Sequence, residues 1–347
     1  MLDLTYIRSL SEIDSSLANL LASAPAAPPP SGLQEMREIS MAKLRASIAD
    51  KKEGVTERHI TLPYSDGTTA THIVVSPTDM SKHSSHPLVV LFFGGGFILN
   101  GPEQMVPYAR SLALLFGVVT VCGAYRLAPE HPFPTQSKDG WDVLKWVAAN
   151  AKTELGADPA AGFIVGGASA GGNIVAVLAQ KAKDENLSPP LTGQYIGTSI
   201  FFSSDTVPEE YRDFFISREQ NAEAPVLNKG MVEMMMGAWN PDWSSPWCSP
   251  INSKSGVKGL PKTYSQVCGL DMLRDDGLIY DEMLKKAGVE TKLDVYPGLS
   301  HAFWAFFPQL EATREALIDV AVGFGWLLGK QVDREAASEA VQAPNSA

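Results

Sequence analysis

The chain has 347 residues, of which 45% are hydrophobic and 19% charged, a composition typical of soluble globular proteins. Its 28 Lys and Arg and 39 Asp and Glu give a formal net charge of −11, which argues against nucleic acid or an anionic membrane surface as a partner. The N-terminus has no basic segment followed by a continuous apolar run, and no apolar run approaches the roughly 20 residues that span a bilayer. We therefore expect a cytoplasmic protein without a membrane span.

Three cysteines, Cys122, Cys248 and Cys268, are too few and too scattered for a disulfide framework or a zinc site. Cys122 and Cys268 lie in apolar runs, so we expect them to be buried thiols in a reducing compartment.

Two stretches near the N-terminus, residues 1–23 and 33–49, carry apolar side chains at helical spacing. The proline-rich run 24–32 between them predicts a short, stiff linker. Because both helices precede the first strand, residues 1–55 are interpreted as an N-terminal cap arm, with a simple packing arm as the alternative.

Strand patterns follow. Runs 55–61 and 69–76 flank a turn-rich connection and predict an antiparallel pair at the edge of a sheet. Runs 87–93 and 117–124 are continuously apolar, which is typical of strands buried on both faces.

Three consecutive glycines, Gly94 to Gly96, end the apolar run 87–93. Glycines at the end of a buried strand leave backbone N–H groups free to approach a substrate oxygen, which is the donor geometry of an oxyanion hole. The alternative interpretation is a flexible loop.

Residues 167–171 read G-x-S-x-G around Ser169, between the apolar run 163–165 and the helical run 174–179. This strand, turn and helix order is that of a nucleophile elbow, in which a strained turn raises the serine Oγ above the strand ends. The following helix N-terminus directs N–H groups toward negative charge that forms there. Ser169 is therefore the predicted nucleophile, the alternative being an ordinary glycine-rich turn.

Three motifs carry a family resemblance: Phe-Gly-Gly-Gly-Phe at 93–97, Tyr-Arg-Leu-Ala-Pro-Glu-His-Pro-Phe-Pro at 125–134, and Gly-Ala-Ser-Ala-Gly-Gly-Asn at 167–173. Together they resemble the hormone-sensitive-lipase-like family of α/β-hydrolases, most of which are carboxylesterases. The resemblance extends from about residue 60 to residue 325. It implies an α/β-hydrolase fold and serine esterase chemistry.

The sequence departs from the family pattern at Phe93 and Ala168, where the family usually carries histidine and an acidic residue. Both departures remove a polar group near the expected catalytic centre. The family's histidine helps to fix the glycine loop through hydrogen bonds, so either packing fixes the loop here or the hole is imperfect. We hypothesise that Phe93 accompanies a specialised substrate, such as a biosynthetic ester or thioester.

Composition changes again at residues 205–247, which are rich in aromatic and methionine residues. By the family resemblance this segment is a cap insertion that supplies part of an acyl or alcohol pocket, and methionine suits irregular apolar shapes. The alternative is that these side chains form only the core of the cap. The residues are Tyr211, Phe214, Phe215, Met231, Met234, Met235, Met236, Trp239, Trp243 and Trp247.

Three carboxylates compete as the acid after the predicted strand 263–269. Asp271 comes first beyond the strand and matches the first Asp of the family's Asp-Pro-Leu-Arg-Asp pattern. Asp275 and Asp276 fall at the start of the predicted helix 277–287, where carboxylates commonly act as caps. Asp271 is therefore the predicted acid.

His301 follows the last clear strand, 291–296, and lies downstream of the acid, as the Ser, Asp, His order of the fold requires. It matches the family's Gly-x-x-His-Gly-Phe pattern, with Ala302 in place of the second glycine. His131 lies in a proline-braced turn and is interpreted as structural. The other histidines, His59, His72, His83 and His86, precede the main part of the sheet.

The predicted fold is one α/β-hydrolase domain with a mainly parallel central sheet flanked by helices. Its core comprises residues 56–204 and 248–330, and its helical cap comprises residues 1–55 and 205–247. Residues 331–347 are small and polar and are predicted to be a disordered tail.

The predicted reaction is hydrolysis of a small to medium, mostly apolar carboxylic ester through an acyl-enzyme. No metal or organic cofactor is implied, the expected partner is a small-molecule ester, and the sequence leaves a homodimer open. The alternatives are an acyltransferase, a thioesterase or a product-releasing hydrolase with the same triad, and a non-catalytic small-molecule receptor. The assigned residues are Ser169, Asp271 and His301 for the triad, Gly95, Gly96 and Ala170 for the oxyanion hole, and Phe93 and Phe97 for the substrate pocket.

Overall fold

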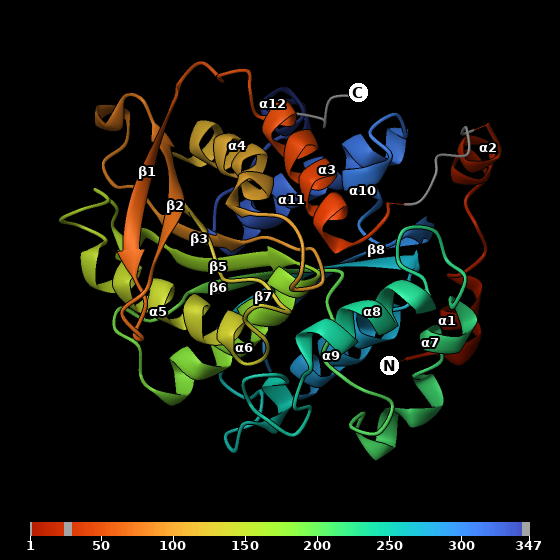
Figure 1. The fold of residues 1–347 in the computed structure, drawn as a ribbon. Helices are drawn as coiled ribbons and strands as arrows, with labels where there is room; N and C mark the ends of the chain where they lie inside the picture. Colours follow the sequence, from red (N-terminus) through yellow and green to blue (C-terminus); the bar gives the residue numbers. More distant parts are fainter. Residues whose placement is uncertain (1, 24–29, 342–347) are drawn as a thin grey trace.

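The computed structural model describes residues 2–23 and 30–341, and an eight-stranded sheet runs through them (Figure 1). The strand order is β1-β2-β4-β3-β5-β6-β7-β8. The β1–β2 and β2–β4 pairs are antiparallel and all the others are parallel. The strands are β1 (Val55–Pro63), β2 (Thr69–Pro77), β3 (Leu88–Phe92), β4 (Val119–Gly123), β5 (Phe163–Ala168), β6 (Gly193–Gly197), β7 (Lys262–Leu270) and β8 (Thr291–Ser300). The predicted edge pair and mainly parallel sheet are confirmed.

Helices cover both faces of the sheet, α4 and α11 on one side and α5, α6 and α9 on the other (Figure 1). The helices are α1 (Leu4–Ser9), α2 (Ser15–Ser23), α3 (Leu33–Ser47), α4 (Val106–Phe116), α5 (Thr135–Asn150), α6 (Ala170–Asp184), α7 (Ser217–Gln220), α8 (Lys229–Trp239), α9 (Arg274–Lys286), α10 (Phe303–Phe306), α11 (Glu311–Leu327) and α12 (Arg334–Ala340). A short 3-10 turn, η2 (Pro102–Met105), leads into α4. Every residue of β3, β4 and β6 is buried, and β3 is apolar throughout, as is typical of a strand covered on both faces.

The parallel register brings the ends of the central strands together. Phe92 at the end of β3 lies opposite Gly167 of β5, and Ala168 lies opposite Gly197 of β6. The loops after β3, β5, β7 and β8 therefore emerge at one edge of the sheet, where this class of fold places its binding sites. In Figure 1, α3 and α8 lie on opposite sides of this edge.

Residues 2–23 form two short helices, α1 and α2, where the sequence predicted a single helical stretch. Asp14 interrupts the helical pattern because its carboxylate accepts hydrogen bonds from the N–H groups of Ser16 and Leu17 and so starts a new helix. Residues 24–29 of the predicted proline-rich linker lie outside the described residues. Within the described residues, no helix is long and apolar enough to cross a membrane.

The prediction that residues 331–347 are a disordered tail is wrong for part of that segment. Residues Arg334–Ala340 form α12, and Ala337 packs in a buried cluster with Ile318 and Ala321 of α11. Small side chains permit this close packing, a signal that composition alone obscured. Residues 342–347 lie outside the described residues.

Candidate active site

Ser169 lies in a turn that only glycine-rich sequence allows. Its backbone has φ 55° and ψ −121°, outside the usual regions for a residue with a side chain. The Ser169 N–H donates to the Gly197 carbonyl at 2.7 Å, which holds the turn against β6. A Cβ atom on Gly171 would lie 2.2 Å from the Phe92 carbonyl oxygen, so the helix can approach β3 only with glycine at that position.

His301 and Asp271 meet Ser169 at the carboxyl edge of the sheet. His301 Nε2 lies 3.0 Å from Ser169 Oγ, and His301 Nδ1 lies 2.8 Å from Asp271 Oδ2. Asp271 is fully buried, and its Oδ1 accepts a hydrogen bond of 2.9 Å from the Leu273 N–H. The structure thus brings together the predicted nucleophile, base and acid in one hydrogen-bonded row.

The competing candidates for the base and the acid, His131, Asp275 and Asp276, make other contacts. His131 is exposed, its backbone N–H donates to the Leu127 carbonyl of the same loop, and its carbonyl accepts from the Gln136 side chain of α5. Asp275 and Asp276 lie inside the first turn of α9, which begins at Arg274 and not at 277 as predicted. They do not cap this helix, because each carboxylate accepts hydrogen bonds from a different segment of the chain.

The glycine loop, defined here as residues 93–100, follows β3 and lies against the serine turn at Gly94, where an added Cβ would lie 3.2 Å from Ser169 Cβ. Gly95 has φ 123° and Gly96 has φ 59°, conformations that favour glycine. Within the described residues, no protein acceptor takes the N–H groups of Gly95, Gly96 or Ala170. The Gly94 N–H is occupied, since it donates to Gln104 Oε1 at 2.6 Å, and Asn100 Nδ2 donates to the Gly94 carbonyl at 3.0 Å.

Phe93 is fixed by packing. Its ring stacks on Tyr125 with centroids 4.0 Å apart and an interplanar angle of 7°, and the Tyr125 hydroxyl donates to the Phe93 carbonyl at 2.8 Å. Phe97 stacks in the same way on Trp239 of α8, with centroids 3.8 Å apart. Both rings are buried, and neither lines the cavity beside α3 or the cavity beside α8. Their contacts therefore hold the glycine loop.

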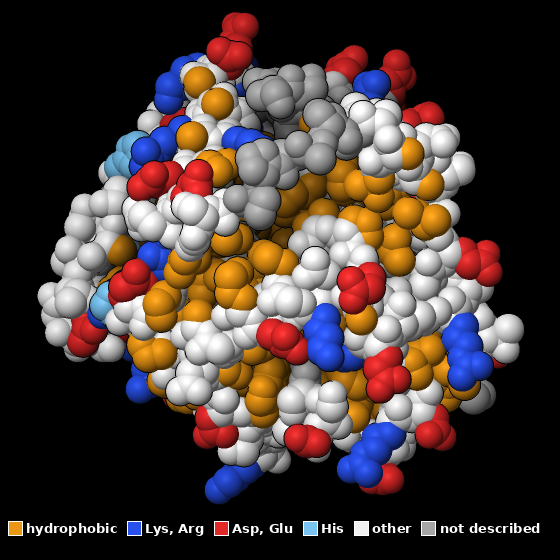
Figure 2. Space-filling model, turned by 45° about the vertical axis from the view of Figure 1, so that its right-hand side comes forward, with side chains coloured by type: hydrophobic (Ala, Val, Ile, Leu, Met, Phe, Trp, Pro, Cys, Tyr) orange, Lys and Arg blue, Asp and Glu red, His pale blue; other side chains and the backbone are white. Residues whose placement is uncertain are grey.

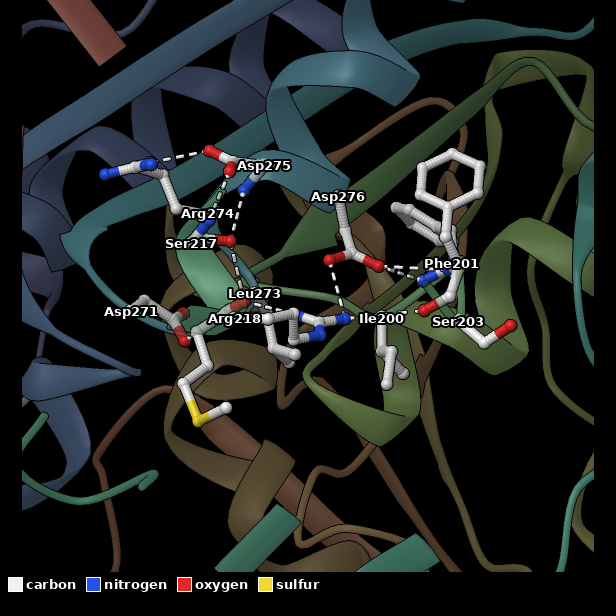
Figure 3. Close-up of polar contacts among 12 residues, drawn as sticks. Ile200, Phe201, Ser203, Ser217, Arg218, Asp271, Leu273, Arg274, Asp275 and Asp276 are labelled. Carbon is white, nitrogen blue, oxygen red and sulfur yellow. Dashed lines mark hydrogen bonds and ion pairs between the residues drawn. The ribbon is translucent and has the colours of Figure 1, made fainter. Parts of the chain in front are cut away.

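The acid loop, defined here as residues 271–273, is held by Ser217 and Arg218 of α7 (Figure 3) and by Asn221, the residue after α7. Ser217 Oγ donates to the Met272 carbonyl at 2.8 Å, and Arg218 Nη1 donates to the same carbonyl. Asn221 Nδ2 donates to the Asp271 carbonyl at 2.7 Å. These contacts fix the backbone from which the Asp271 side chain extends.

Two buried carboxylates of α9 fix the segments around the acid loop. Asp275 Oδ2 accepts hydrogen bonds from the N–H groups of Ile216 and Ser217, while its Oδ1 accepts from Arg274 Nε at 2.7 Å. Asp276 Oδ1 accepts from the backbone N–H groups of Phe201 and Phe202 at 2.7 and 3.0 Å.

Asp276 also faces a cation. Its Oδ2 lies 2.8 Å from Arg218 Nη2 as an ion pair without hydrogen-bond geometry. Burial raises the pKa of Asp276 to about 6, against the lowering influence of Arg218 and of the two backbone N–H groups. In Figure 3 the Arg218 guanidinium lies between the acid loop and the Asp276 carboxylate.

The segment 198–203 follows β6, which ends at Gly197. The chain leaves the sheet there because Phe201 and Phe202 donate to Asp276 and not to a neighbouring strand. Ser199 Oγ donates to the Ser169 carbonyl at 3.0 Å, so this segment also supports the serine turn.

Residues 205–247 border a cavity of about 530 Å³, which we call the α8 cavity. Its wall includes Phe202, Arg218, Met236, Trp243 and Met272. Met235, one residue earlier on α8, packs so closely on the glycine loop that a Cβ on Gly96 would lie 2.2 Å from its sulfur.

The three cysteines are buried and unpaired, as expected for Cys122 and Cys268. Within residues 2–23 and 30–341, no group of three His, Cys, Asp or Glu side chains is arranged to hold a metal ion.

Sequence reasoning missed the residues that hold the two loops, above all Gln104, Asn100, Ser217 and Asn221. Each forms a hydrogen bond with a backbone group of one of the loops, from 6 and 10 residues away for Asn100 and Gln104 and from 55 and 50 residues away for Ser217 and Asn221. No motif or periodicity marks such a residue. Asn173 carried a weak signal, because it ends the serine motif, and its amide donates to the carbonyls of Ile200 and Cys248.

Comparison with known proteins shows the family. Residues 89–305 match the model of a family described as having the α/β-hydrolase fold. A Schizosaccharomyces pombe protein of the AB hydrolase superfamily is 36% identical over 85% of this chain and 87% of its own length. The carboxylesterase NlhH of Mycobacterium tuberculosis is 37% identical over 66% of this chain and 70% of its own length. The crystal structure of vibralactone cyclase has a TM-score of 0.86 and 30% identity, covering 95% of this chain and 97% of that one.

Proposed function

We propose hydrolysis of a carboxylic ester at Ser169 for this chain, which belongs to the hormone-sensitive-lipase-like carboxylesterases of the α/β-hydrolase family. The observation that carries the proposal is the row of hydrogen bonds from Asp271 through His301 to Ser169, at 2.8 and 3.0 Å. A nucleophile, a base and an orienting acid at these separations are what acyl transfer requires.

In the proposed reaction Ser169 Oγ attacks the ester carbonyl while His301 Nε2 takes its proton. His301 then protonates the leaving alcohol, and the acyl group remains on Ser169 until water, activated by the same imidazole, releases the acid. Asp271 holds the imidazole in the tautomer with the proton on Nδ1 and stabilises the imidazolium that forms. The Leu273 N–H on the other oxygen of Asp271 supports this orientation.

The negative charge of the tetrahedral intermediate is proposed to be stabilised by the N–H groups of Gly95, Gly96 and Ala170. Their lack of a protein acceptor supports this role, since a buried donor without a partner is costly unless a ligand satisfies it. The Gly94 N–H is excluded because Gln104 occupies it. Loss of one donor of this kind typically costs about 100-fold to 1000-fold in kcat.

The N-terminal helices and residues 205–247 are proposed to form the cap. Met235 of α8 lies against Gly96, and Arg37 of α3 donates to the carbonyls of Ile98 and Ala128 at 2.8 and 2.6 Å. Both segments therefore contact the glycine loop from outside the sheet. Such contacts support a role in shaping the substrate site and excluding water.

A second candidate function keeps the same acyl-enzyme but transfers the acyl group to an acceptor other than water. The likeness to a structure named as a cyclase favours this alternative, because ring closure is transfer to a group within the substrate itself. The stacked position of Phe93 on Tyr125 fits either function, since the glycine loop is held without the family's histidine. A non-catalytic receptor is disfavoured by the complete row of reactive groups.

The test is hydrolysis of p-nitrophenyl esters from acetyl to decanoyl by wild type and Ser169→Ala, with a serine-directed phosphonate as a second measurement. We expect turnover by wild type and a loss of about 10⁶-fold in the variant. Labelling by the phosphonate at Ser169 with no ester turnover would shift the function to a specialised acyl acceptor, which product analysis by mass spectrometry then identifies. Neither turnover nor labelling would overturn the proposal.

A further inference from the structure

The three proposed oxyanion donors belong to peptide groups whose carbonyl oxygens are themselves hydrogen-bonded. A trans peptide is planar, with its C=O and N–H pointing in opposite directions, so a hydrogen bond to the carbonyl also fixes the direction of the N–H. The carbonyls concerned are those of the preceding residues: Gly94 for the Gly95 donor, Gly95 for the Gly96 donor and Ser169 for the Ala170 donor. The groups that bind these carbonyls therefore orient the donors.

Two of these carbonyls are held by the core and by the glycine loop itself. The Ser169 carbonyl accepts hydrogen bonds from a backbone N–H of α6 at 3.1 Å and from Ser199 Oγ at 3.0 Å. The Gly95 carbonyl accepts from the N–H groups of Ile98 and Leu99 at 3.1 and 3.0 Å. Both donors are thus oriented by hydrogen bonds that do not involve the N-terminal helices.

The Gly94 carbonyl is held by a side chain, the amide of Asn100. Asn100 Nδ2 donates to this carbonyl at 3.0 Å, and a Cβ on Gly95 would lie only 2.8 Å from the same nitrogen. Because a carbonyl can only accept, Nδ2 faces Gly94 and leaves Oδ1 for a donor. That donor is Ser40 of α3, whose Oγ donates to Asn100 Oδ1. Two hydrogen bonds in series therefore link α3 to the peptide group of the Gly95 donor.

Polar contacts also hold α3 against the glycine loop. Arg37, one turn before Ser40 on the same side of the helix, donates to the Ile98 carbonyl at 2.8 Å and pairs with Glu130 at 2.7 Å. None of the 15 residues of α3 is buried, and its second half borders a cavity of about 670 Å³. Figure 2 shows a hollow on the face that carries the carboxyl edge of the sheet, with hydrophobic side chains on its visible wall. The position of α3 therefore relies largely on these polar contacts.

We propose that Ser40 and Asn100 are positioning residues for the Gly95 oxyanion donor, so that the position of α3 on the glycine loop governs how well this donor stabilises the transition state. This inference rests on the proposed esterase function and adds to it a route by which the N-terminal cap acts on the chemical step. Both side chains act through the Gly94 peptide group. Because the oxyanion forms only after attack on the ester carbonyl, their loss should lower kcat and leave KM almost unchanged.

The first test removes the Ser40 hydroxyl. We expect Ser40→Ala to lower kcat on p-nitrophenyl acetate about three- to tenfold with KM within about twofold, because a misplaced donor loses much of its effect. Ser40→Thr keeps a hydroxyl and should restore most of the rate.

Ser47→Ala is the matched control for this test. Ser47 is also half-buried on α3, but its Oγ donates at 2.8 Å to the Leu44 carbonyl of the same helix and not to the glycine loop. This variant should match wild type. Equal kcat values for Ser40→Ala and Ser47→Ala would overturn the proposal.

A double variant shows whether Ser40 acts through Asn100. Asn100 has φ 73°, so glycine can replace it without backbone strain, and we expect Asn100→Gly to lower kcat about tenfold. Ser40→Ala should then have no further effect in the Asn100→Gly background, because the link is already broken. Losses that multiply in the double variant would show that Ser40 acts independently of Asn100 and would overturn the assignment. Thermal unfolding checks that each variant folds.

Hydrogen exchange separates this inference from the proposed function. Mass spectrometry of a peptide that spans residues 93–100 needs no ester turnover, and we expect exchange there to be faster in Ser40→Ala than in Ser47→Ala or wild type. Absent ester turnover by wild type together with this exchange pattern would remove the esterase function and keep the link from α3 to the loop. Equal exchange in the two variants would remove the link, whether or not esters are turned over.

Discussion

The two loops that face Ser169 are held by different kinds of interaction. Next to the serine turn the glycine loop is held by neutral groups: Gln104, Asn100 and Tyr125 each contribute one hydrogen bond, and Phe93 adds a ring stack. The Arg37 guanidinium contacts this loop farther along the chain, at the Ile98 carbonyl. The acid loop is held beside buried charges, with Arg218 on one of its carbonyls and Asp275 and Asp276 fixing the neighbouring segments.

This difference predicts how mutations in the supports of each loop affect the protein. A neutral hydrogen bond contributes about 0.5 to 1.5 kcal/mol, so losing one shifts the glycine loop without unfolding the protein. Removing one member of a buried ion pair leaves an uncompensated charge, which costs about 3 to 5 kcal/mol. Damage on the glycine side should therefore appear mainly in catalysis, and damage on the acid side mainly in stability.

The largest expected effect comes from Asp275→Ala. Asp275 and Arg274 are both fully buried, and the change leaves the guanidinium without its carboxylate and two backbone N–H groups without an acceptor. We expect the free energy of unfolding to fall by about 3 to 5 kcal/mol in urea denaturation. Glu209→Ala, which breaks an exposed pair with Arg212, is the control and should cost less than about 1 kcal/mol. Equal losses in the two variants would contradict the buried-charge account.

The second largest expected effect is a dependence of stability on pH, which Asp276 beside the acid loop should cause and the glycine loop should not. The pKa of Asp276 is raised to about 6 from 3.8, so the folded protein holds this proton more tightly than the unfolded chain. Its contribution to stability is therefore present below about pH 4 and is lost as the pH rises to about 6, by as much as about 3 kcal/mol. Asp276→Asn lacks this titration.

The measurement is the difference in unfolding free energy between wild type and Asp276→Asn from pH 4 to pH 7, in which the other titrating groups largely cancel. We expect the advantage of wild type over the variant to shrink across this window and then to level off. A constant difference would show that Asp276 does not titrate there. The glycine loop has no corresponding group, since burial raises the pKa of Tyr125 well above 10.

The sequence was sufficient for the fold and for the row of reactive side chains because both are encoded locally. Continuous apolar runs marked β3 and β4, and the glycines around Ser169 marked a turn that tolerates no Cβ at Gly171. The loop supports could not be predicted, since the hydrogen bond from Asn221 to Asp271 joins residues 50 positions apart. Asp275 and Asp276 were misread as helix caps because sequence does not reveal which distant N–H groups a carboxylate will meet.

A smaller effect on stability, but a clear one on rate, is expected from Gln104→Leu. The change frees the Gly94 N–H and lets the glycine loop shift by a fraction of an ångström. We expect kcat on the acetyl ester to fall by about tenfold, because donors to an oxyanion act only when correctly placed. Gln104→Glu keeps an acceptor oxygen and should restore most of the rate. Equal rates for Gln104→Leu and wild type would show that the loop needs no such support.

The smallest effect comes from Tyr125→Phe, for which the chain offers a close control in Tyr64→Phe. Each tyrosine is buried and donates its hydroxyl to a backbone carbonyl, Tyr125 to Phe93 at 2.8 Å and Tyr64 to Ala124 at 3.1 Å. Each change should lower the free energy of unfolding by about 1 kcal/mol. Only the Tyr125 bond lies on the glycine loop, so only Tyr125→Phe should also lower kcat, by about two- to threefold, with the ring stack preserved. An equal change of kcat in both variants would mean that stability alone, and not the position of the loop, governs the rate.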